Sequence, residues 1–106
     1  MKIDKATRAS LDADVAKLKE KGEAVTAALT AYNEARDTMH GTLDTLCTDL
    51  RDEYEGKSER WQEGEKGQAA DAWIEEIEGK RDELADEVDI ELPDADELVG
   101  FGDSPE

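Results

Sequence analysis

Apolar residues recur along the first half of the chain at alternating steps of four and three. One set of positions, seven apart, consists of Leu11, Leu18, Val25, Tyr32, Met39 and Leu46 (the Leu11 set). A second set, four residues further on, consists of Val15, Gly22, Leu29, Arg36, Leu43 and Leu50 (the Val15 set). Ten of these twelve positions are apolar, as is typical of the two core positions of a coiled-coil heptad. The pattern predicts one long helix from about Asp4 to Gln62.

Two glycines interrupt this pattern. Gly22 and Gly41 each cost about 1 kcal/mol relative to alanine inside a helix. The sequence His40-Gly41-Thr42 could instead form a turn that converts the long helix into a hairpin. No proline occurs before Pro93, so nothing forces a break. We favour the uninterrupted helix, with a break at Gly41 as the alternative.

A second, shorter helix is expected after residues 64–67, where Gly64 and Gly67 stand among charged residues and favour a turn. Within a helix from Gln68 to Val88, the apolar stripe consists of Ala70, Ile74, Ile77, Leu84 and Val88, with Trp73 beside it. We expect this stripe to pack against the first helix near Tyr54 and Trp61. The predicted fold class is all-α, with a long helix plus a shorter antiparallel helix (a helical hairpin or coiled coil) and an acidic C-terminal tail.

The tail comprises residues 89–106, because the apolar period ends at Asp89 and Pro93 cannot continue a helix. Five apolar side chains could dock this tail locally or contact a partner: Ile90, Leu92, Leu98, Val99 and Phe101. Without such contacts the tail would be disordered. The predicted organisation is a helical domain over residues 1–88 and an acidic tail over residues 89–106.

Acidic residues dominate the composition, with 30 Asp and Glu against 13 Lys and Arg and a formal net charge of -17. Residues 1–50 carry a net charge of -2 and residues 51–106 carry -15, and no base follows Arg81. Direct binding to nucleic acid or to an anionic membrane needs a basic surface, so both classes of partner are excluded. The acidic second half favours contact with a basic protein surface instead.

No constellation typical of an enzyme is present. One histidine, His40, and one cysteine, Cys47, cannot complete a catalytic triad, a zinc site or an internal disulfide. Phosphate-binding glycine loops and EF-hand spacing are missing as well. We therefore predict a protein that is not an enzyme and uses no cofactor or metal. No segment resembles a signal peptide or an apolar run of about 18 residues, which makes the cytoplasm the expected location.

Candidate binding residues lie on the second predicted helix. Eight acids fall within the 17 residues from Asp71 to Glu87. On a helix this is one negative charge per about 3 Å of axis, close to the roughly 3.4 Å per phosphate of one DNA strand. The partner-binding candidates are Glu75, Glu78, Asp82, Glu83, Asp86 and Glu87. Such a helix would present a basic nucleic-acid groove with an imitation of its ligand, whereas the alternative is a solvated face that keeps the protein soluble.

Residues 57–68, with the sequence Lys-Ser-Glu-Arg-Trp-Gln-Glu-Gly-Glu-Lys-Gly-Gln, and the following Ala72-Trp73-Ile74 carry a resemblance. This run resembles a segment of small uncharacterised proteins of bacteriophages and prophages, which implies a phage source. The size, helicity and acidity also resemble phage inhibitors of host defence, including anti-CRISPR and anti-restriction DNA mimics. This second likeness is one of composition and implies an inhibitor that acts in the host-cell cytoplasm.

Two function classes follow. The favoured one is a non-enzymatic acidic binding protein that occludes a basic nucleic-acid-binding surface of a partner protein, such as a host defence nuclease. The alternative is a structural or assembly coiled-coil protein of a phage particle, in which the heptad is the working surface. Because the heptad is longer than the second helix can cover, we also expect a homodimer through residues 11–50.

Overall fold

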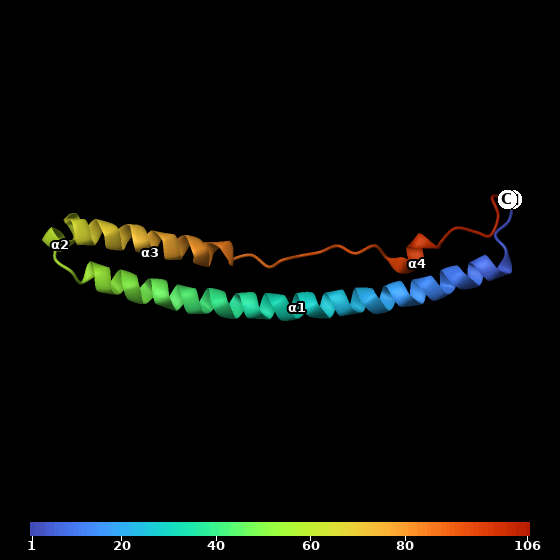
Figure 1. Ribbon diagram of the computed structural model, residues 1–106, viewed down its shortest axis with the longest axis horizontal. Coiled ribbons are helices and arrows are strands. Elements are labelled where there is room, and N and C mark those ends of the chain that lie inside the picture. The colour runs from blue at the N-terminus through green and yellow to red at the C-terminus, as the bar shows by residue number, and fades with distance from the viewer. The chain divides into compact units, whose positions relative to one another are not determined.

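All regular structure in the chain is helical. The computed structural model describes residues 1–106 and contains no strand (Figure 1). Its helices are α1 (Lys5–Glu55), α2 (Glu59–Glu63), α3 (Glu65–Glu83) and α4 (Ala95–Leu98). The all-α class is therefore confirmed. The chain divides into two compact units, unit 1 with residues 1–31 and 89–106, and unit 2 with residues 32–88.

The long helix predicted from the heptad is α1. Its first turn is capped by Asp4, whose carboxylate accepts a hydrogen bond of 2.6 Å from the backbone N–H of Thr7. This hydrogen bond lowers the pKa of Asp4. The helix continues through Gly41, so the break considered there does not occur. It ends at Glu55, before the predicted Gln62, because the chain turns at Gly56 and starts a new helix three residues later, at Glu59.

A tight corner joins α2 to α3 in unit 2. Ser58 caps α2 by accepting a hydrogen bond of 3.2 Å from the N–H of Trp61. Gly64 ends α2 and precedes α3, so the predicted turn is present there. Gly67, which was assigned to the same turn, lies inside α3 and is buried. A Cβ atom at Gly67 would lie 2.3 Å from the carbonyl oxygens of Trp61 and Gln62, so only glycine lets α3 pass so close to α2.

Unit 2 has a small core between α1 and α3. Cys47 is 1% exposed and Ile74 is 2% exposed, while Tyr54 and Trp61 pack edge to face with ring centroids 6.1 Å apart. Trp73 borders the same shallow groove as Trp61, yet it is 54% exposed. The predicted packing of the second helix near Tyr54 and Trp61 is therefore present, with Ile74 rather than an indole at its centre.

Two polar side chains of α1 hold the segment that follows α3 in the same unit. The guanidinium of the buried Arg36 donates to the carbonyl oxygen of Leu84, the capping residue that follows the last residue of α3. The amide of Asn33 donates to the carbonyl oxygen of Val88 and accepts from its N–H, both at 2.9 Å. A cation at a helix C-terminus is favourable because the terminal carbonyls are unpaired and carry partial negative charge. The helix predicted to reach Val88 thus ends at Glu83, and α1 side chains bond the residues beyond it.

Unit 1 joins the first turns of α1 to the last eighteen residues. Arg8 donates to Asp103 at 2.6 Å and to the carbonyl oxygen of Phe101 at 3.1 Å, and it lies over the Phe101 ring. Lys19 pairs with Asp96 at 2.9 Å, which raises the pKa of Lys19. The buried Ala95 begins the short helix α4. Residues 89–106 therefore dock on their own chain, which was one of the alternatives for the tail.

Candidate acidic interface

The six candidate acids all belong to unit 2, and they fall into two structural groups. Glu75, Glu78, Asp82 and Glu83 lie on α3, whereas Asp86 and Glu87 lie beyond its end. The unit as a whole contains 18 acids and 7 bases, a net charge of -11. Its surface is therefore strongly negative wherever the acids are not paired within the unit.

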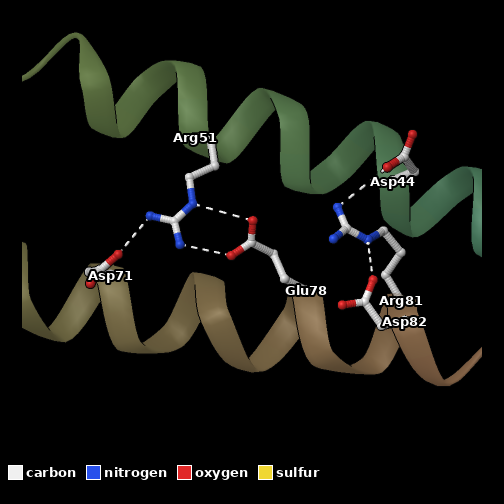
Figure 2. Close-up of polar contacts among 6 residues, drawn as sticks. All are labelled: Asp44, Arg51, Asp71, Glu78, Arg81 and Asp82. Atoms are coloured by element: carbon white, nitrogen blue, oxygen red, sulfur yellow. Dashed lines mark hydrogen bonds and ion pairs between the residues drawn. The ribbon is translucent and has the colours of Figure 1, made fainter.

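Glu78 faces α1 rather than solvent. Figure 2 shows its carboxylate taking two hydrogen bonds from Arg51, at 2.8 and 3.4 Å, while the same guanidinium donates to Asp71 at 2.6 Å. The hydrogen bond from Arg51 lowers the pKa of Glu78, and the two carboxylates raise the pKa of Arg51. Glu78 therefore helps to hold α3 against α1, and its carboxylate is not free to bind a partner.

A second ion-pair group lies further along the same two helices. Arg81 donates to Asp82 at 3.0 Å and to Asp44 of α1 at 3.4 Å (Figure 2). The hydrogen bond to Asp82 raises the pKa of Arg81. Because Arg51 pairs with Asp71 while Arg81 pairs with Asp44, α3 runs antiparallel to α1 within unit 2. The predicted antiparallel arrangement is thus present, and Asp82 is partly neutralised by its neighbour.

The remaining acids are exposed. Glu83 lies 3.9 Å from Lys80, and both side chains are well solvated, so this pair contributes little. Among the eight acids from Asp71 to Glu87, four are exposed and form no ion pair: Glu75, Glu76, Asp86 and Glu87. We call these four residues the unpaired acids. Glu76 was not among the predicted candidates, although it is exposed on α3 as Glu75 is.

The density of outward-facing negative charge on α3 is lower than the sequence predicted for the second helix. Of the eight acids between Asp71 and Glu87, two bind Arg51 and two lie past the end of α3. The four outward acids on α3 span residues 75–83, about 12 Å of helix axis. Asp71 and Glu78 are seven residues apart and so share one helix face, which is the sequence signal for their common partner on α1.

Exposed carboxylates of this kind accept hydrogen bonds from lysine and from the paired N–H groups of arginine. No group of three or more His, Cys, Asp or Glu side chains is arranged to hold a metal ion. None of the helices combines the length and the apolar character needed to cross a bilayer.

No protein-family model, curated protein or solved structure matches the chain.

Proposed function

We propose that this chain is a non-enzymatic acidic binding protein that occludes a basic nucleic-acid-binding surface of a partner protein. The observation that carries the proposal is the set of unpaired acids on a unit with a net charge of -11. A groove built for phosphates offers lysine and arginine side chains, and solvent-exposed carboxylates can take the place of phosphate oxygens there. The pairing of Glu78 with Arg51 moves the proposed contact to Glu75, Glu76, Asp86 and Glu87.

The setting of this activity is also a proposal. The chain would act in the cytoplasm of a host cell as a phage inhibitor of a defence protein, in the manner of a DNA mimic, and would need no cofactor. The acidic composition and the helical fold support this class over direct binding to nucleic acid. Self-association into a homodimer belongs to the same proposal.

Neutralising the unpaired acids tests the proposed contact. The test variant carries Glu75→Gln, Glu76→Gln, Asp86→Asn and Glu87→Gln. The matched control removes the same charge from exposed acids of unit 1, through Asp12→Asn, Asp14→Asn, Glu20→Gln and Glu23→Gln. The probe is a DNA-binding protein that the immobilised chain retains from a bacterial lysate at about 50 mM salt, a concentration at which charge contacts are strong.

If the proposal is right, duplex DNA releases the retained protein, about 500 mM salt abolishes its binding, and the test variant loses it while the control keeps it. Equal binding at both salt concentrations, or DNA that stays bound to the retained protein in the complex, would rule out mimicry. Loss of binding in both variants alike would show that net charge and not this surface is responsible.

The assembly alternative has its own supporting observation, which is the exposure of Leu18, Tyr32 and Met39 along α1. A structural coiled coil would use these residues and would be indifferent to the unpaired acids. The variant without the unpaired acids therefore also separates the two functions. Under the assembly alternative, this variant assembles as well as the unaltered chain does.

A further inference from the structure

The two heptad sets of α1 have different environments. Members of the Val15 set are half-buried or buried, Arg36 most of all at 8% exposure. From Leu18 onward the Leu11 set is exposed, with Leu18, Val25, Tyr32, Met39 and Leu46 between 41% and 56% exposed. The predicted heptad therefore contains one face that the chain covers itself and one that it leaves open.

The open face is a second heptad in its own right. Three residues after each exposed member of the Leu11 set stands another exposed residue: Lys21, Ala28, Ala35, Thr42 and Asp49. We call these ten residues the free stripe. In the middle of the free stripe, large side chains alternate with small ones. Residues 24–33 contain no charged residue, although 41% of the residues in the chain are charged. A merely solvated helix face would not be so apolar in such a chain.

We infer that the free stripe binds the same stripe of a second copy of this chain, in antiparallel orientation. The inference rests on the self-association proposed above and is independent of the unpaired acids. A stripe with a seven-residue repeat fits a helix with the same repeat, and a two-fold axis makes the two surfaces identical. The second copy thus covers apolar side chains that its own chain leaves exposed.

The charges at the ends of the stripe decide the orientation. Lys17 and Lys21 lie at the unit 1 end and Asp49 and Asp52 at the unit 2 end, all exposed and none in an ion pair of its own chain. A parallel pair would place lysine beside lysine and aspartate beside aspartate, which is unfavourable. An antiparallel pair places the lysines of one copy beside the aspartates of the other.

One antiparallel register also matches side-chain sizes. It places Tyr32 of one copy opposite Ala35 of the other, and Met39 opposite Ala28. Lys17 then lies near Asp52 of the second copy. Large residues facing small ones fill the space between two helices without overlap.

The first experiment measures mass in solution by sedimentation equilibrium, with no partner protein present. We expect the unaltered chain to form a dimer, about twice 11.7 kDa, at tens of micromolar. Ala35→Glu puts an unpaired carboxylate in the middle of the stripe and should weaken dimerisation by on the order of a hundredfold. Thr30→Glu adds the same charge at an exposed position off the stripe and should leave the dimer unchanged.

Circular dichroism checks that each variant keeps its helix content, and Met39→Glu repeats the test at an independent position. A strict monomer for the unaltered chain would overturn the inference. So would a dimer that Ala35→Glu and Met39→Glu leave intact. Neither result touches the proposed contact with a basic partner, which is measured on the unpaired acids.

A charge exchange tests the orientation. Lys17→Glu with Lys21→Glu should weaken the dimer at low salt, and adding Asp49→Lys with Asp52→Lys should restore it. In a parallel dimer the first pair of changes only replaces one like-charge contact with another. An unchanged dimer after Lys17→Glu and Lys21→Glu would therefore overturn the antiparallel arrangement.

Discussion

Two glycines of α3 should respond in opposite directions to the same substitution. Gly79 lies in the helix interior and nothing comes within 4 Å of a Cβ atom built there. Gly67 is buried, and a Cβ atom there would overlap three backbone atoms of Trp61 and Gln62 at 2.3 to 2.4 Å. Neither glycine has a positive φ, so the difference comes from space alone.

The magnitude follows from two opposing effects. Alanine is favoured over glycine in a helix interior by about 1 kcal/mol, so Gly79→Ala should stabilise unit 2 by about that amount. Gly67→Ala gains the same helix propensity, but its new methyl group must push α3 away from the backbone of Trp61 and Gln62. Backbone atoms cannot move aside by changing rotamer as a side chain can. Overpacking costs roughly 1 to 3 kcal/mol, and overlap with backbone belongs at the upper end. The net loss is about 2 kcal/mol, and the two variants should differ by about 3 kcal/mol.

Thermal unfolding followed by circular dichroism measures the difference. At about 4 to 8 °C per kcal/mol for a unit of this size, the two midpoints should lie more than about 10 °C apart. The reasoning would be refuted if Gly67→Ala unfolded at the temperature of the unaltered chain or above it. Gly41→Ala, at an open position of α1, serves as a second control and should behave like Gly79→Ala.

Three further predictions concern side chains of unit 2. Asn33→Ala removes both hydrogen bonds to Val88 and should cost about 1 to 2 kcal/mol in urea unfolding, and an unchanged midpoint would contradict their role in holding residues 84–88. Because Arg51 lowers the pKa of Glu78, that contact stabilises above the ordinary carboxyl pKa of 4.5 and loses its effect as the pH falls through the lowered value. Glu78→Gln should therefore lower the urea midpoint at about pH 7 and change it little at about pH 2, whereas an equal loss at both would refute the ion-pair explanation. Trp73→Ala should cost about 2 kcal/mol rather than the roughly 3 to 5 kcal/mol of a fully buried tryptophan, since about half of its surface is exposed, and a larger loss would show it to be part of the core.

Apolar periodicity was enough to predict the helices. The twelve-position heptad predicted a helix through Gly41, and the stripe around Ile74 predicted a shorter helix packed on it. Periodicity failed at the ends, because helix termini depend on caps and not on the apolar repeat. The stripe continues to Val88, but α3 ends at Glu83, where Leu84 meets the guanidinium of Arg36.

Polar residues were harder to interpret from the sequence. Arg36 stands at a core position of the heptad, and the sequence alone offered no partner for its charge, whereas the structure buries it with its guanidinium donating to the carbonyl oxygen of Leu84. Asn33 gave no signal, since its two hydrogen bonds depend on which backbone residue happens to lie opposite. Composition alone could not separate Glu75 from Glu78 either. Both are acids on one helix, and what separates them is that Glu78 shares a helix face with Asp71, where Arg51 of the neighbouring helix pairs with both.

The burial of Cys47 gives this protein an internal reporter of its own opening. Its thiol is 1% exposed and is the chain's single sulfhydryl group, so a thiol reagent can reach it only when unit 2 opens. The labelling rate, divided by the rate for the unfolded chain, gives the population of the open form. Unit 1 contains no cysteine, so this population describes unit 2 alone. Comparing it with the global unfolding equilibrium would show whether the two units of one continuous α1 melt together or one after the other.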